Sequence, residues 1–178
     1  MIREFSIKAK PTNGKARKLT ATLFILCAIL TVVYLAIPTY KGIVGFFILV
    51  LITAAVFLYN KYIASVYYYD LTFDHTGECV FVVRQTVGKK VSTLARLSLS
   101  DVTDVSVIDS AAYKKLRTPL GYRKYVYLPT VSPATVCVMT VISPYESATV
   151  AIELSQEMAN LLKEYTELQK KDYKAEDF

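Results

Sequence analysis

Two long stretches without a charged residue lie near the N-terminus, at residues 19–37 and 42–59. At 1.5 Å of rise per residue, each stretch makes a helix of about 27 Å, close to the thickness of a bilayer's hydrocarbon core. The segment between them, PTYKG, contains a proline and a glycine, which favour a turn between two helices. The pattern therefore predicts a transmembrane helical hairpin over residues 19–60.

A secretory signal peptide followed by a buried core helix is the alternative for this region. The hydrophobic part of a signal peptide spans about 7–15 residues and ends in small residues at a cleavage site. The first apolar stretch, LTATLFILCAILTVVYLAI, is longer and lacks such an exit. The sequence thus favours two membrane spans, with Tyr34, Tyr40 and Tyr59 placed where aromatic residues gather at membrane interfaces.

From residue 66 onward the hydrophobic pattern has a period of two, with Tyr67, Tyr69, Leu71 and Phe73 on one face of a half-buried strand. Further runs rich in β-branched and aromatic residues are separated by turn residues such as Gly88. They predict strands within residues 79–87, 90–97, 101–109, 121–129, 134–143 and 148–154. The second half of the chain is therefore predicted to be a β-domain of about seven strands.

One helix is predicted to follow the last strand, over residues 155–171. Ser155 is a typical N-cap residue and Glu157 suits the first turn. The hydrophobic residues beyond them fall on one face at helical spacing, and they are Met158, Leu161, Leu162, Tyr165 and Leu168. This amphipathic helix is expected to cover the core of the β-domain, and residues 172–178 are expected to form a charged tail.

The segment DHTGEC, residues 74–79, holds the only histidine together with two carboxylates and a thiol. Between two predicted strands it reads as a hairpin turn, in which Gly77 takes a positive φ and Asp74 begins the turn. A metal site needs three or four converging ligands, whereas consecutive turn residues point in different directions. The sequence predicts a turn here, with no metal and no catalytic role.

The positive charge of the chain is unevenly distributed. Residues 1–18, expected to be a basic tail, hold six lysines and arginines against Glu4, and the turn of the hairpin holds only Lys41. The positive-inside rule then predicts a multi-pass protein of the plasma membrane with both termini in the cytoplasm. Residues 61–178 carry 14 basic and 14 acidic residues, so the formal charge of +6 comes from the N-terminal segment and Lys41. The β-domain is therefore neutral, and no nucleic-acid partner is expected.

Catalytic and cofactor signatures are not found in the sequence. Cys27, Cys79 and Cys137 are widely spaced, without a C-x-x-C pair, and are expected to be free buried thiols. These observations predict a protein that is not an enzyme and uses no cofactor.

The order of predicted elements resembles that of pleckstrin-homology-like (PH-like) domains, in which about seven strands are followed by one C-terminal helix. The residues that carry the resemblance are YYYDLTFDHTGECVFVVRQTVGKK, LSLSDVTDVSVI and ATVAIELSQEMANLL. With the preceding hairpin, the chain resembles small uncharacterised membrane proteins of the Gram-positive bacterial type. The resemblance implies a PH-like fold over residues 61–171 and implies no catalytic residues.

The most unusual part of the predicted β-domain is the segment AAYKKLRTPLGYRKYVY, within residues 111–128, which contains no acidic residue. It interleaves basic with aromatic and aliphatic side chains, and its candidate contact residues are Lys114, Lys115, Arg117, Tyr122, Arg123 and Lys124. Three interpretations remain open. The segment is a solvated cover whose charges pair with the C-terminal helix, a contact for anionic lipid headgroups, or a site for a protein partner or phosphorylated ligand.

The expected function is that of a membrane-anchored, non-enzymatic interaction module at the inner membrane surface, which recruits or positions a protein partner. The alternative is a sensor of anionic lipid or of a small phosphorylated ligand, acting through the basic aromatic segment.

Overall fold

The computed structural model describes residues 4–9 and 14–176, with side chains for all of these except residue 38 and residues 170–176. The chain divides into two units: residues 11–65, and a β-domain made of residues 1–10 together with 66–178.

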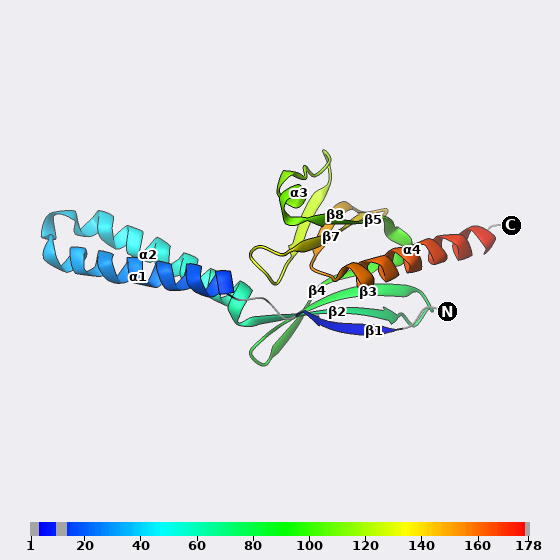
Figure 1. Ribbon diagram of the computed structural model, residues 1–178, viewed down its shortest axis with the longest axis horizontal. Coiled ribbons are helices and arrows are strands. Elements are labelled where there is room, and N and C mark those ends of the chain that lie inside the picture. The colour runs from blue at the N-terminus through cyan, green and yellow to red at the C-terminus, as the bar shows by residue number, and fades with distance from the viewer. Residues whose placement is uncertain (1–3, 10–13, 177–178) are drawn as a thin grey trace. The chain divides into compact units, whose positions relative to one another are not determined.

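The first unit is a helical hairpin. Helix α1 covers Gly14–Ala36, a 3-10 turn covers Pro38–Tyr40, and α2 covers Lys41–Leu58 and continues as a π-helical turn, Tyr59–Ile63. The two helices run side by side (Figure 1). In the described part of the chain, Gly14–Ala36 and Lys41–Ile63 are the helices long and apolar enough to cross a membrane. Both extend a few residues beyond the predicted spans, because basic residues such as Lys18 also favour helix.

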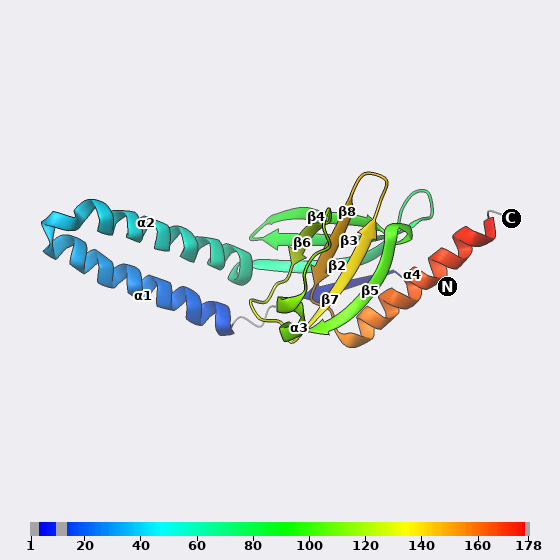
Figure 2. The ribbon, with the colours of Figure 1, turned by 90° about the horizontal axis from the view of Figure 1, so that it is seen from above.

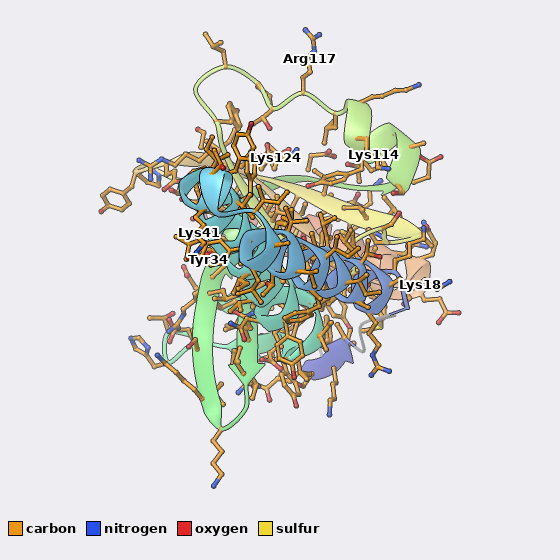
Figure 3. The ribbon with its side chains drawn as sticks, turned by 90° about the vertical axis from the view of Figure 1, so that its left-hand side faces the viewer. Lys18, Tyr34, Lys41, Lys114, Arg117 and Lys124 are labelled. Atoms are coloured by element: carbon orange, nitrogen blue, oxygen red, sulfur yellow. The ribbon has the colours of Figure 1, made fainter. Side chains whose placement is uncertain are left out.

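Aromatic side chains hold the lysines at both ends of the hairpin. Near the turn, the Nζ atom of Lys41 lies 5.9 Å from the centre of the Tyr34 ring, and Figure 3 shows the two side by side. At the other end, the Nζ atom of Lys61 lies 5.3 Å from the centre of the Tyr62 ring. Such cation–π contacts let long basic side chains lie along an apolar surface while the charge stays at its end.

The β-domain begins with a four-stranded sheet, sheet 1, in the order β1-β2-β3-β4. Its strands are β1 (Phe5–Ala9), β2 (Ser65–Phe73), β3 (Cys79–Val87) and β4 (Lys90–Ser98). The turn between β2 and β3 is the predicted one, since Gly77 has φ +82° and its N–H donates to the Asp74 carbonyl.

Strand β1 lies within residues 1–18, where the sequence predicts a basic tail. It pairs antiparallel with β2, with Phe5 opposite Leu71 and Ala9 opposite Tyr67. The short alternation FSIKA explains the strand, because Phe5 and Ile7 pack against the core while the residues between them face outward. Arg3 and Lys10 of the expected tail lie outside the described residues. The helical hairpin is thus inserted between two paired strands.

The second sheet, sheet 2, has the order β5-β7-β8-β6. Its strands are β5 (Val102–Asp109), β6 (Arg123–Tyr127), β7 (Thr135–Ile142) and β8 (Ser147–Ile152). β6 pairs parallel to β8, and the chain between these two strands contains β7, which pairs antiparallel to β8 on its other side. A short helix, α3 (Ser110–Lys115), lies within the connection that leads from β5 to β6. The described residues therefore form eight strands where about seven were expected, and β1 is the added one.

Helix α4 (Gln156–Glu176) follows sheet 2 as predicted and lies against β5 (Figure 2). The N–H of Met158 donates to the Ser155 hydroxyl at 3.4 Å, as expected of an N-cap. Ala159 and Leu162 are buried in the core. The helix continues five residues beyond the predicted end at 171, which shortens the expected charged tail, and residues 177 and 178 lie outside the described part.

Tyr69, in the middle of β2, ties the two sheets together. Its ring is fully buried and its hydroxyl donates to the Tyr127 carbonyl at 2.8 Å. The same hydroxyl accepts the N–H of Glu153 at 3.4 Å. Burial raises the pKa of Tyr69 above its usual value, so the phenol stays protonated and able to donate. One side chain of sheet 1 thereby holds the end of β6 beside the end of β8.

Asp70, the next residue of β2, joins three strands on the outer face of sheet 1. Its carboxylate accepts hydrogen bonds from the Ser6 hydroxyl of β1 and from the Arg84 guanidinium of β3. Asp70 is only 3% exposed, and a buried carboxylate is tolerated because Arg84 carries the opposite charge and the Ser6 hydroxyl donates to the other carboxylate oxygen. Strand β1 is therefore held to β2 by the Ser6–Asp70 hydrogen bond as well as by backbone pairing.

Replacing Asp70 with asparagine should loosen β1, because the carboxylate that joins Ser6 to Arg84 is lost. We expect the free energy of unfolding to fall by about 1–3 kcal/mol and the amide hydrogens of β1 to exchange faster with solvent. Chemical denaturation and hydrogen exchange of the full chain in detergent measure the two effects. Asp104→Asn, at an exposed position of β5, is the control and should change stability by less than about 0.5 kcal/mol. Equal losses in both variants would contradict this role of Asp70.

Candidate interaction surface

The first two candidate residues, Lys114 and Lys115, lie in the last turn of α3. The Asp109 carboxylate begins this helix by accepting the N–H of Ala112 at 2.6 Å. Both lysines are exposed, and their position at the C-terminal end of a helix favours positive charge. The backbone therefore presents two neighbouring ammonium groups to solvent.

The loop after α3 presents an arginine and a leucine. Arg117 is exposed and points away from the rest of the domain (Figure 3). A turn then forms, in which the N–H of Tyr122 donates to the Pro119 carbonyl at 3.1 Å and Gly121 has φ +86°. Leu120, at this turn, is fully exposed. A leucine in that position gains free energy only when something covers it.

The last candidates, Arg123 and Lys124, begin β6 and have partners within the domain. Lys124 places its Nζ atom 4.7 Å from the centre of the Tyr113 ring. An Arg123 nitrogen lies 3.6 Å from the Glu146 carboxylate, which also accepts the Tyr125 hydroxyl at 2.7 Å. These contacts fix β6 against α3 and against the turn between β7 and β8.

The structure thus divides the six sequence candidates into two groups. Arg123 and Lys124 are held by neighbouring side chains, and Tyr122 is half-buried. Among the described residues, no ion pair is formed by the other three, which are Lys114, Lys115 and Arg117. We call these three cations, together with the exposed Leu116 and Leu120, the α3–β6 surface.

The charge pairing with the C-terminal helix that one interpretation required is not found among the described side chains. The pairing of Arg123 with Glu146 was not expected either. The two residues are far apart in the sequence, and they meet only because β6 joins sheet 2 beside β8. The sequence offers no local signal for that pair.

The other polar cluster considered in the sequence, at Asp74 and His75, is a structural turn. The second carboxylate oxygen of Asp74 pairs with Arg96 at 2.7 Å, and the His75 ring is largely exposed. No group of three or more histidine, cysteine, aspartate or glutamate side chains in the described residues is arranged to bind a metal. The turn links the β2–β3 connection to β4.

The cysteines are free and buried, as the sequence predicted. Burial raises the pKa of the Cys79 thiol to about 11 and that of Cys137 to about 12. Both thiols are therefore protonated near neutral pH, and a protonated buried thiol is a poor nucleophile.

Comparison of the chain with protein-family models, with curated proteins and with solved structures finds no match.

Neutralising the three cations of the α3–β6 surface should leave stability unchanged, because none of them has a charged partner in the described domain. We expect the variant with Lys114, Lys115 and Arg117 all changed to glutamine to lose less than about 0.5 kcal/mol of unfolding free energy. Glu146→Gln should lose about 1 kcal/mol, because Glu146 binds both Arg123 and Tyr125. Denaturant titration of the full chain in detergent compares the two. A larger loss in the triple variant would show that its charges hold the fold.

Proposed function

We propose that this protein is a membrane-anchored, non-enzymatic interaction module. Its helical hairpin spans the plasma membrane, and its β-domain lies on the cytoplasmic side, where it recruits or positions a protein partner.

The main support for the proposed membrane anchoring is the pairing of β1 with β2. These strands flank the hairpin in the sequence, and their backbones are hydrogen-bonded to each other. Two strands can pair only if they lie on the same side of a membrane. The pairing therefore supports an even number of crossings, which α1 and α2 provide.

The charges at the two ends of the hairpin support a cytoplasmic β-domain. Lys15, Arg17 and Lys18 lie at the start of α1, and Lys61 lies at the end of the second helix. The turn between the helices holds Lys41 alone. Because positive residues are retained on the cytoplasmic side, the end that carries four cations is the inner one.

We further propose that the β-domain is a variant of the PH-like fold. Supporting this are the two sheets and the C-terminal helix α4 packed against β5. Two edge strands distinguish the domain from a simple seven-stranded form: β1, supplied from before the hairpin, and β6, which runs parallel to its neighbour.

The α3–β6 surface is the proposed contact for the protein partner. Its three cations form no ion pair among the described residues and suit an acidic partner, and its exposed leucines suit an apolar side chain of that partner. The second candidate is an anionic lipid surface. It is favoured by the full exposure of Leu120 beside the cations, since a leucine flanked by basic residues can enter the headgroup region.

The orientation is tested by labelling single introduced cysteines with a membrane-impermeant maleimide. Lys41→Cys, in the turn of the hairpin, should react in intact cells, whereas Lys114→Cys, in α3, should react only after the cells are opened. The native cysteines are buried and supply the unreactive background, which the unsubstituted chain measures. Reaction of Lys114→Cys in intact cells would place the β-domain outside and overturn the proposed orientation.

The partner is tested by placing a photoreactive amino acid at Lys115 of the full chain in its native membrane. A crosslinked protein should appear on irradiation and should disappear when Lys114 and Arg117 are changed to glutamine. The same probe at Lys163, an exposed position of α4, is the control and should capture no such product. Identical capture at both positions would mean that the α3–β6 surface is not a specific contact.

A further inference from the structure

The turn between β3 and β4 carries two lysines between two exposed valines. Gly88 takes φ +60°, and Val87 pairs with Lys90 across the turn. Val87 is 38% exposed and Val91 is 58% exposed, although both are strand residues. We call residues 87–91 the β3–β4 tip.

The β3–β4 tip lies at the end of sheet 1 where the chain connects to the helical hairpin. β1 ends at Ala9, opposite Tyr67 at the start of β2. The Gln85 amide, near the end of β3, donates to the Tyr67 hydroxyl at 3.3 Å, so the end of β3 lies beside the start of β2. Both connections to the hairpin and the turn after β3 therefore belong to one end of the sheet.

The connections themselves are short. Residues 10–13 join β1 to α1, and β2 begins within two residues of the π-helical turn that ends at Ile63. An extended residue spans at most about 3.6 Å, so four residues leave little freedom for this end of sheet 1 to move away from the membrane. The turn after β3 shares that constraint because it belongs to the same sheet.

We infer that the β3–β4 tip rests on anionic lipid headgroups, with Lys89 and Lys90 on phosphate oxygens and Val91 among the glycerol and upper acyl groups. This inference rests on the proposed membrane anchoring and adds a second contact to it. It also assigns separate roles to two surfaces. The β3–β4 tip of sheet 1 contacts lipid, whereas the α3–β6 surface, beside the helix that packs on the outer face of sheet 2, contacts the protein partner.

The charges of the tip fit this role. Lys89 and Lys90 are exposed, and neither forms an ion pair with the residues that the structure describes. Each lysine beside an anionic leaflet raises the bound-to-free ratio about fivefold, so the two lysines together raise this ratio about 25-fold. The covalent anchor raises the effective concentration of headgroups near the tip to the millimolar range, where even a weakly bound state is populated.

Tryptophan fluorescence tests the contact directly, because the chain contains no tryptophan. Val91→Trp places a single reporter in the tip of the full chain, which is reconstituted into vesicles of neutral phosphatidylcholine or of phosphatidylcholine with phosphatidylglycerol. In anionic vesicles we expect emission at shorter wavelength and quenching by brominated lipid. Changing Lys89 and Lys90 to glutamine in the same chain should lower the bound-to-free ratio by up to about 25-fold.

Leu120→Trp, in the α3–β6 surface, is the matched control, since that position is also exposed and flanked by basic residues. It should report water in both kinds of vesicle. A response at position 120 without one at position 91 would overturn the inference and identify the α3–β6 surface as the lipid contact. If position 91 gives no response although the chain floats with the vesicles, the lipid contact of the tip is overturned while the membrane anchoring stands. A chain that enters neither vesicle would overturn the anchoring and the inference together.

Discussion

The architecture depends on the backbone pairing of β1 with β2, because this pairing joins the residues before the helical hairpin to the residues after it. Without it, β2 would be the edge of sheet 1, and Phe5 and Ile7 would leave the apolar core that they help to cover. The ends of the hairpin are restrained by the same hydrogen bonds. A connection of residues 10–64 thus performs the task of a short β-hairpin turn while also supplying two helices long enough to cross a membrane.

Neighbouring residues of β2 complete the structure on opposite faces. Tyr69 reaches inward and holds the ends of β6 and β8, whereas Asp70 reaches outward and binds β1 and β3. Both side chains are buried polar groups with partners, and such groups favour one arrangement over others because alternatives leave them unsatisfied. The contacts of Tyr69 therefore link sheet 1 to sheet 2, and the contacts of Asp70 link three strands within sheet 1.

The sequence predicted the elements whose periodicity is long and uniform. The two apolar helices, most strands and the amphipathic α4 follow directly from it, because burial imposes those periods. Strand β1 was missed because five residues between basic neighbours carry a weak alternation, and its partner lies beyond the hairpin. The candidate residues Lys114, Lys115 and Arg117 were found from charge alone, but which cations have partners depended on tertiary contacts. The pairing of Arg123 with Glu146 and the location of the β3–β4 turn arise only from sheet topology.

The insertion of the hairpin between two paired strands also dictates an order of events during synthesis. Residues 5–9 leave the ribosome first, yet their partner, residues 67–71, is made only after both apolar helices have emerged. The N-terminal strand therefore stays without its β2 partner until both apolar helices have been synthesised. Under the proposed membrane anchoring, a chain in which only one of the two helices crossed would leave β1 and β2 on opposite sides of the membrane, where they cannot pair and sheet 1 cannot be completed.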